Sequence, residues 1–168
     1  MLLATSASDL QKIFDAVVDA SAKLGLHVNA KKTKVMVVSK SEFTPSCQLQ
    51  QGNTTIEQVE QFNYLGALVT SDVRCKNEIR KRISMAKDAF VRLRKVLTDR
   101  KLSHVIKVRL LKTFVWSALL YGCESWTLTK ETMKNIEAAE MWFYRRMLLR
   151  ISYTERKTND EVLARIEQ

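Results

Sequence analysis

The stretch Phe62-Asn63-Tyr64-Leu65-Gly66 separates two parts of this 168-residue chain that differ in their apolar patterns. A lysine-containing loop, Asn29-Ala30-Lys31-Lys32-Thr33, lies ahead of it. The residues around these two segments combine one helical pattern with several short β-branched runs, whereas the residues from Ser71 onward repeat their apolar side chains at helical spacing. The sequence therefore predicts an α+β part followed by a helical part.

The first part is expected to hold one helix and several short antiparallel strands. Ser8, with Gln11 three residues later, is typical of a capping box and predicts a helix over residues 8–24 that Gly25 ends. Its expected inward face consists of Leu10, Ile13, Phe14, Val17 and Leu24. The pair Gly52-Asn53 predicts a hairpin turn. Strands are expected over residues 26–28, 34–38, 47–50, 54–56 and 59–69.

Four helices are expected in the second part. Apolar residues at steps of four and three predict a long helix over residues 75–98 with an inward seam. The seam consists of Ile79, Ile83, Ala86, Phe90, Leu93 and Leu97. Two further helices are predicted over residues 103–121 and 130–149, and the capping box Thr158-Asn159-Asp160-Glu161 starts the fourth. The inward residues expected in the third are Met133, Ile136, Ala139, Phe143 and Met147.

The positive charge of the chain is concentrated in one region. The formal net charge is +10, and residues 74–112 hold 14 Lys/Arg against three Asp/Glu, while the remainder holds 14 against 15. Such a basic block on helices favours binding of a polyanion, and nucleic acid is the commonest. A solvated face, or an exposed segment of a larger parent protein, is the alternative.

Metal, disulfide and membrane functions find little support. Cys47, Cys75 and Cys123 are far apart and form no C-x-x-C pair, and His27 and His104 stand alone, so we expect incidental or buried thiols and no metal site. No apolar run reaches the roughly 20 residues that cross a bilayer. We therefore expect an intracellular protein, nuclear or cytoplasmic, with no membrane partner.

Four segments of the chain resemble reverse transcriptases encoded by non-LTR retrotransposons. They are Leu2-Leu3-Ala4 followed by the helix from Asp9-Leu10; Gly25-Leu26-x-Val28-Asn29-x-x-Lys32-Thr33-Lys34-x-Met36; Phe62-x-Tyr64-Leu65-Gly66; and Glu78-Ile79-x-x-Arg82-Ile83-x-x-Ala86 with Leu120-Tyr121-Gly122-x-Glu124-x-Trp126. The resemblance implies a partial polymerase palm over residues 1–72 with a primer-grip-like turn. A basic helical thumb over residues 73–122 and a C-terminal helical extension over residues 123–168 would follow.

The chain also departs from that family. Its polymerases hold two Mg²⁺ ions with a cluster of aspartates, and the resemblance places the paired aspartates just before Met1. Asp9, Asp15 and Asp19 are interpreted instead as cap and surface charges. We therefore expect no catalytic residue, no metal and no cofactor in this chain. Mg²⁺ is expected only in a full-length parent, where Lys32 matches a general acid; a solvated turn lysine is its interpretation here.

The resemblance also implies the binding residues. Tyr64, Leu65 and Gly66 would place a tight turn against a primer, although a turn with Tyr64 and Leu65 in the core is equally open. Basic residues off the helical seam would contact phosphates: Arg80, Lys81, Lys87, Arg92 and Arg94. Three tryptophans are expected in the core or an interface, Trp116, Trp126 and Trp142, and three arginines are left open, Arg145, Arg146 and Arg150.

Three functions remain open from the sequence. The first is a fragment that binds RNA–DNA hybrid or other nucleic acid and is inactive alone. The second is a vestigial protein-interaction domain without a nucleic-acid ligand, which pairs with itself or with the missing upstream polymerase portion. The third is an enzyme completed in trans by that upstream portion.

Overall fold

The computed structural model describes residues 1–39, 44–149, 155–164 and 166, and the chain divides into two compact units, Met1–Arg74 and Cys75–Gln168. The predicted α+β class is confirmed by helices combined with small sheets. The expected boundary after residue 72 lies two residues from this division. The boundary expected after residue 122 lies inside the second unit, where residues on both sides share one core. Separate roles for the two parts stay a prediction.

The first unit begins with helix α1, Ala7–Lys23, close to the predicted range. Its N-cap is Ser6 rather than Ser8, because the Ser6 Oγ accepts a hydrogen bond from the Asp9 backbone N–H at 3.1 Å and Ser8 already lies inside the helix. Gly25 follows with a φ of +74°, the left-handed conformation that ends helices. The N-cap was thus predicted two residues late, and the first helical residue one residue late.

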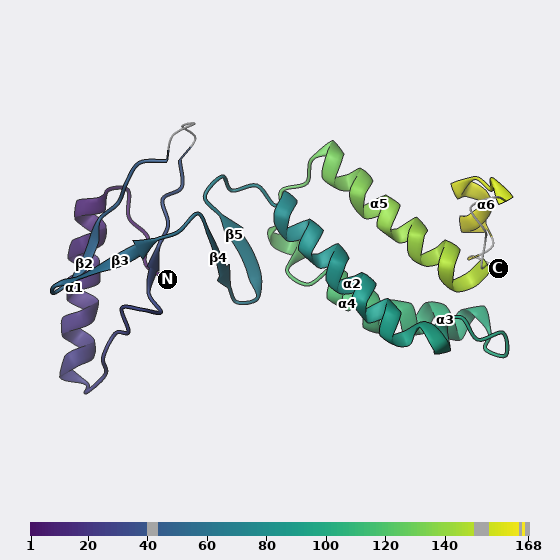
Figure 1. The fold of residues 1–168 in the computed structure, drawn as a ribbon, viewed down its shortest axis with the longest axis horizontal. Helices are drawn as coiled ribbons and strands as arrows, with labels where there is room; N and C mark the ends of the chain where they lie inside the picture. The colour runs from purple at the N-terminus through teal and green to yellow at the C-terminus, as the bar shows by residue number, and fades with distance from the viewer. Residues whose placement is uncertain (40–43, 150–154, 165, 167–168) are drawn as a thin grey trace. The chain divides into compact units, whose positions relative to one another are not determined.

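A three-stranded sheet packs against α1 (Figure 1). It consists of β1 (Lys34–Val35), β2 (Leu49–Gln51) and β3 (Thr54–Gln58) in the order β1-β3-β2. The predicted hairpin at Gly52-Asn53 is confirmed, since β2 and β3 pair antiparallel across it. β1 pairs with β3 in parallel, a difference from the antiparallel set expected.

The core of this unit is small. Its buried residues are Phe14, Val35, Cys47, Leu49 and Ile56. Leu10 and Val18 pack against this cluster at positions i−4 and i+4 from Phe14. Ile13, Val17 and Leu24 are exposed, so the inward face predicted for α1 was too wide. A small sheet covers only one narrow stripe of the helix, and hydrophobic spacing alone does not give the width of that stripe.

Residues 26–28 are not a strand, contrary to prediction. Val28 packs against the core, and its carbonyl accepts a hydrogen bond from the Gln51 side chain at 3.0 Å. A side chain therefore satisfies this carbonyl in place of a neighbouring strand. β1 is also shorter than the five-residue strand expected, since only Lys34 and Val35 pair with β3.

A separate hairpin completes the unit. β4 (Gln61–Tyr64) and β5 (Ala67–Thr70) pair antiparallel across the two-residue turn Leu65-Gly66. Both turn residues have positive φ, +48° for Leu65 and +85° for Gly66, as a type I′ turn requires. A left-handed conformation costs a residue such as leucine roughly 1–2 kcal/mol. The turn thus holds Leu65 under local strain.

The second unit is a helical bundle. α2 (Lys76–Leu97) is followed by a return helix made of α3 (His104–Leu110), the π-helical segment η1 (Leu111–Trp116) and α4 (Ser117–Leu119). A short 3₁₀ turn, η2 (Cys123–Ser125), leads to α5 (Lys130–Tyr144), which continues as a second π-helical segment, η3 (Arg145–Leu149). α6 (Asn159–Ala164) comes last. The four predicted helices are confirmed, and both π-helical segments were missed.

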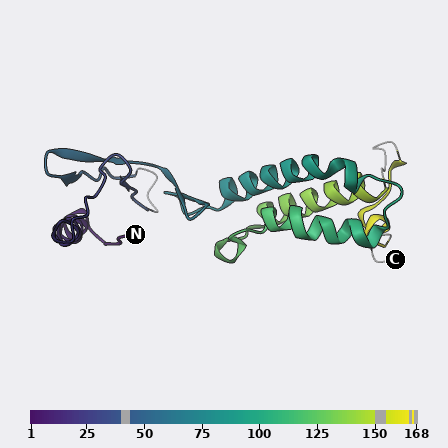
Figure 2. The same cartoon turned by 90° about the horizontal axis from the view of Figure 1, so that it is seen from below.

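α2 contacts both the return helix and α5, and the three lie side by side (Figure 2). α2 and α5 run in the same direction, because Lys76 and Glu131 pair near their starts while Phe90 and Trp142 touch farther along. The predicted capping box of the last helix is confirmed. Thr158 and Glu161 exchange hydrogen bonds between side chain and backbone at 3.3 and 2.9 Å.

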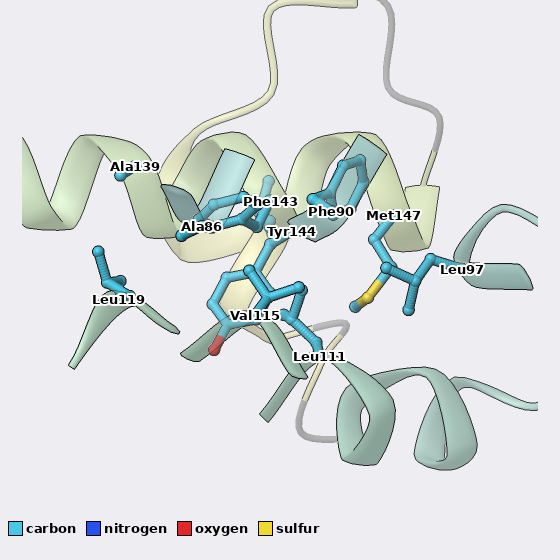
Figure 3. Close-up of a cluster of buried hydrophobic side chains, with 11 residues drawn as sticks. Ala86, Phe90, Leu97, Leu111, Val115, Leu119, Ala139, Phe143, Tyr144 and Met147 are labelled. Carbon is cyan, nitrogen blue, oxygen red and sulfur yellow. The ribbon is translucent and has the colours of Figure 1, made fainter. Parts of the chain in front are cut away.

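One apolar cluster holds this bundle together (Figure 3). Its residues come from α2, the return helix, α5 with η3, and α6: Ala86, Phe90, Leu97, Leu111, Val115, Leu119, Ala139, Phe143, Tyr144, Met147 and Val162. The predicted seam of α2 is confirmed, with Ile83 and Leu93 half-buried beside the cluster. Met133 is exposed, contrary to prediction, and Thr132, which closes the N-terminal capping box of α5, is buried instead.

The three cysteines are free thiols, with Cys47 buried, Cys75 half-buried and Cys123 exposed. Cys75 accepts a hydrogen bond through its sulfur from the Thr127 backbone N–H at 3.3 Å, which ties the start of α2 to the segment before α5. Among the helices of the described residues, none is both long enough and apolar enough to cross a membrane.

Candidate nucleic-acid interface

The whole charge excess lies in the helical unit. Residues 1–74 hold seven Lys/Arg and seven Asp/Glu, so their net charge is zero, and residues 75–168 carry the full +10. α2 supplies the largest share of these cations. Its buried seam fixes which side of the helix faces the core, and the cations can therefore be sorted by the direction in which they point.

Three of the five predicted contact residues form one edge of α2. Arg80, Lys87 and Arg94 are spaced seven residues apart, and residues at that spacing differ by only about 20° around a helix. All three are exposed, and none forms an ion pair with an acidic residue in the described part of the chain. We call these three residues the α2 edge.

The other two predicted residues point elsewhere. Lys81 and Arg92 are eleven residues apart and also share one direction, but each helical step of one residue turns by about 100°, so they lie about 120–140° from Lys87, the middle of the α2 edge. Arg92 is exposed, whereas Lys81 is half-buried. The structure therefore splits the predicted set of five between two sides of α2.

Arg82 belongs to the interior, a position that the charge pattern did not indicate. Its Nε donates a hydrogen bond to the Glu78 Oε1 at 2.6 Å, and both side chains are almost fully buried. The guanidinium also lies 4.6 Å from the centre of the Tyr121 ring. The contact with Tyr121 links α2 to the segment that follows the return helix, and burial with Glu78 removes Arg82 from the accessible charge.

α5 runs along the α2 edge. Near the helix starts, the Lys76 Nζ and the Glu131 Oε1 lie 2.6 Å apart. This hydrogen bond, together with the positive charges of Lys76 and Arg80, holds the pKa of Glu131 below its ordinary value. Farther along, the Lys87 Nζ lies 5.4 Å from the centre of the Trp142 ring. Glu131 therefore partly offsets the positive charge at the beginning of the edge, whereas an aromatic ring faces its middle.

The arginines left open by the sequence have different surroundings. Arg145 is half-buried, and its Nη2 donates to the Lys157 carbonyl at 2.9 Å and to the Asn159 Oδ1 at 2.8 Å, which fastens the chain leading into α6. Arg146 is exposed and stacks on Trp142, with 4.7 Å from its guanidinium carbon to the ring centre. Arg150 lies outside the described residues. The spacing of Trp142 and Arg146, four residues apart on a predicted helix, was the available signal.

The three tryptophans are half-buried, as expected for packing residues. The indole N–H groups of Trp116 and Trp126 are buried and have no hydrogen-bond partner within the described structure. Trp116 also lies 6.1 Å from Tyr144, measured between ring centres, in a tilted arrangement. Burial raises the pKa of Tyr144, and so does the carboxylate of Glu140, which accepts its hydroxyl hydrogen bond at 3.0 Å.

The residues of the primer-grip-like turn are exposed. Tyr64 is 39% exposed and Leu65 is 78% exposed, which contradicts the alternative that placed both in a core. Their neighbours Phe62 and Val69, which pair across the hairpin, are also 38% exposed each. Gly66 has the positive φ that the turn needs. Contact of this turn with a primer stays a prediction.

The lysine loop is built around Asn29. The backbone N–H of Lys32 donates to the Asn29 side chain at 3.2 Å, and the Thr33 hydroxyl donates to the Asn29 carbonyl at 2.9 Å. Lys31 and Lys32 are exposed, while Lys34 forms an ion pair with its cross-strand neighbour Glu57. These positions suit the interpretation of Lys32 as a solvated turn lysine.

Two acidic residues of α1, Asp9 and Asp15, fill local structural roles. The Asp9 carboxylate accepts a hydrogen bond from the Ser6 hydroxyl at 2.7 Å, and the Asp15 carboxylate accepts one from Gln11 at 2.7 Å. Across the described residues, no group of three or more His, Cys, Asp or Glu side chains is arranged to hold a metal ion. The absence of a bound metal stays a prediction.

Comparison with known proteins adds one relative. No protein-family profile matches the chain, and no solved structure matches it. A Caenorhabditis elegans protein, described as uncharacterized and transposon-derived, is 27% identical over 167 residues, covering 95% of this chain and 57% of that protein. The chain thus spans little more than half the length of this relative. The similarity supports a transposable-element origin for the chain.

Proposed function

We propose that the chain is a nucleic-acid-binding fragment derived from the reverse transcriptase of a non-LTR retrotransposon, and that it is inactive as a polymerase on its own. The observation that carries this proposal is the α2 edge, three exposed cations in one line beside the buried seam that fixes this helix in the core. The transposon-derived relative supports the same origin. The proposed ligand is an RNA–DNA hybrid or another nucleic acid.

The chemistry of the edge suits a phosphate backbone better than base recognition. Its side chains are long cations without a partner acid in the described residues, and such groups neutralise phosphates without reading sequence. Tyr64, Leu65 and Gly66 would add a turn that approaches the primer closely. In this proposal Lys81 and Arg92 add charge from the second side of α2.

A salt titration tests the proposal. Binding of a fluorescein-labelled RNA–DNA hybrid, followed by anisotropy, should weaken as salt rises, because phosphate contacts release counterions. The α2 edge alone implies a log–log slope of about −2 to −3, and all five predicted cations imply about −3.5 to −4.5. Hybrids of unrelated sequence should bind with similar affinity, because phosphate contacts carry no sequence information.

Charge reversal provides the decisive comparison. The triple variant Arg80→Glu, Lys87→Glu, Arg94→Glu should lose binding while its helical circular dichroism is unchanged, because none of the three lies on the buried seam. The matched control reverses three exposed cations elsewhere, Lys12, Lys23 and Arg109. If both triple variants lose affinity equally, net charge rather than the α2 edge governs binding. Binding that survives the first reversal with an unchanged slope would refute the proposal.

Polymerase activity has a separate test. Primer extension on an RNA template, with Mg²⁺ or Mn²⁺, should give no incorporation above a buffer blank, because the proposal places the catalytic aspartates outside this chain. Calorimetry with Mn²⁺ should likewise detect no stoichiometric site. Incorporation by the purified chain would show that it carries a complete active site.

An interaction domain without a nucleic-acid ligand is the second candidate. Apolar residues exposed in the first unit favour it, namely Ile13, Val17 and Leu24 on and just after α1. Under this alternative the chain associates with itself or with another protein through these residues and does not bind the RNA–DNA hybrid. Sedimentation at rising concentration, together with the anisotropy titration, separates the two candidates.

A further inference from the structure

Trp142 is held by aromatic neighbours from two helices. Its ring lies 5.4 Å from Phe90 on α2 and 5.1 Å from Phe143 on α5, both in edge-on arrangements measured between ring centres. Phe90 and Phe143 are almost fully buried, whereas Trp142 is half-buried at the border of the core. The indole is therefore a fixed feature of the surface where α2 and α5 meet.

Two cations from different helices approach this one ring. The Arg146 guanidinium carbon is 4.7 Å from the ring centre and the Lys87 Nζ is 5.4 Å from it. The two positive centres are thus no farther apart than these distances added together, about 10 Å, which is the rise of roughly three nucleotides along one strand of B-DNA. The ring brings together two like charges that would otherwise repel each other.

Two acidic residues of α5 interact with groups other than this pair. Glu131 pairs with Lys76 at the start of the helices, and Glu140 accepts the Tyr144 hydroxyl. In the part of the chain that the structure describes, neither Lys87 nor Arg146 forms an ion pair. The positive potential of the pair is therefore available to an external anion.

We propose that Lys87 and Arg146 form a two-cation clamp for neighbouring phosphates of a nucleic-acid backbone, with Trp142 as its positioning residue. The inference rests on the proposed function and adds α5 to the interface. A guanidinium over an aromatic ring keeps its N–H donors, which lie in the guanidinium plane, free to bind phosphate oxygens. Lys87 contributes a point charge to the same strand, and Arg80 and Arg94 extend the contact along α2.

In this proposal Trp142 positions the two cations and does not bind phosphate itself. Lysine and arginine side chains are flexible, and ordering them on binding costs conformational entropy. Contact with the ring restricts both side chains before the ligand arrives. An aromatic residue at position 142 is therefore expected to strengthen phosphate binding without itself touching the ligand.

Single neutralisations test the clamp. Lys87→Gln and Arg146→Gln should each reduce the steepness of the log–log salt slope for the labelled hybrid by about 0.7–0.9, and the double variant by about 1.4–1.8. Arg109→Gln, an exposed arginine on α3, makes the same change of charge away from the ring and should leave the slope unchanged. Arg146 is exposed, so its replacement should not disturb folding.

Substitution of the ring tests the positioning role. Trp142→Phe keeps an aromatic face and should retain near-parental affinity, whereas Trp142→Leu keeps the net charge and should weaken binding several-fold. Circular dichroism verifies that both variants fold. If Trp142→Leu does not fold, the salt slope of Arg146→Gln tests the clamp instead. Equal binding by the folded Phe and Leu variants would remove Trp142 from the clamp.

The outcomes separate the clamp from the proposed function. If the unchanged chain does not bind the hybrid, both inferences are overturned. If it binds and the charge reversal of the α2 edge abolishes binding, but Arg146→Gln behaves like Arg109→Gln, the clamp is overturned and the proposed function stands. A loss of salt slope on replacement of Arg146 and of the α2 edge residues, with no loss for Arg109→Gln, supports both.

Discussion

The two units of this chain differ in how charge is related to the core. Residues 1–74 are neutral and surround a cluster of five buried apolar residues. Residues 75–168 carry a net charge of +10 and surround a cluster of eleven, and α2 contributes both to this core and to the exposed charge. We therefore expect the second unit to be the more stable one, and its cations to be held in more defined positions.

The β4–β5 hairpin of the first unit lacks the packed support that the helices of the second unit have. β4 is exposed along its whole length, and an isolated two-stranded hairpin is at best marginally stable in water. Its tip would be a mobile contact, whereas the α2 edge is attached to a packed helix. The two predicted binding elements, the hairpin turn and the α2 edge, therefore differ in how rigidly the surrounding structure holds them.

The largest expected effect tests whether the units are independent. Phe90→Ala removes a ring from the larger core and should destabilise it by about 3–5 kcal/mol. All three tryptophans lie in residues 75–168, so tryptophan fluorescence, excited at a wavelength that tyrosine does not absorb, reports that unit alone during urea unfolding. Phe14→Ala should leave this fluorescence transition in place. A similar shift of the transition midpoint for both variants would mean that the units unfold as one.

The buried ion pair should give the next largest effect. Glu78→Gln leaves the Arg82 charge buried without its carboxylate and should cost about 3 kcal/mol of unfolding free energy. The double variant Glu78→Leu, Arg82→Leu should recover much of that loss, because the desolvation of both charges disappears. Lys76→Gln, in an exposed pair on the same helix, is the control and should barely move the urea midpoint. If Glu78→Gln leaves the urea midpoint unchanged, water reaches the Glu78–Arg82 pair.

A smaller change, a gain in the stability of the β4–β5 hairpin, is expected in the first unit. Leu65→Asn should stabilise the hairpin by about 1 kcal/mol, because asparagine tolerates the left-handed conformation that the turn imposes. Slower hydrogen exchange of the β4 and β5 amides would show this. Leu65→Ile provides the opposite control, since a β-branched residue fits such a turn poorly. Faster exchange in the asparagine variant would contradict the turn geometry.

The smallest effect concerns the pH dependence of the ion pair between Lys76 on α2 and Glu131 on α5. The folded-state pKa of Glu131 is lowered, so its pairing contributes to stability above its ordinary pKa and is lost as the pH falls through the folded-state value. A carboxyl titration by nuclear magnetic resonance should show this low midpoint. Lys76→Gln should raise the midpoint towards the ordinary value. An unchanged midpoint in that variant would assign the shift to another group.

Prediction from the sequence succeeded where periodicity is strong and local. The long seam from Ile79 to Leu97, the hairpin at Gly52-Asn53 and the capping box at Thr158 are all confirmed. It failed at Leu26–Val28, where a side-chain hydrogen bond replaces a strand partner, and at Met133, which the helical spacing placed inside. Short segments carry too few residues for periodicity to decide between strand and loop.

The sequence by itself determined the class of elements, the location of the charge excess and the direction of the seam on α2. These follow from local propensities and from the 3.6-residue period of a helix, which needs no partner to be recognised. Only the tertiary structure decided which cations stay accessible. Arg82 is buried with Glu78, Arg145 fastens the segment before α6, and Arg146 meets Lys87 across Trp142. The contacts of Arg145 with the segment before α6 and of Lys87 with Trp142 depend on how segments distant in sequence pack, and the burial of Arg82 depends on the same packing. Single-residue patterns do not specify that packing.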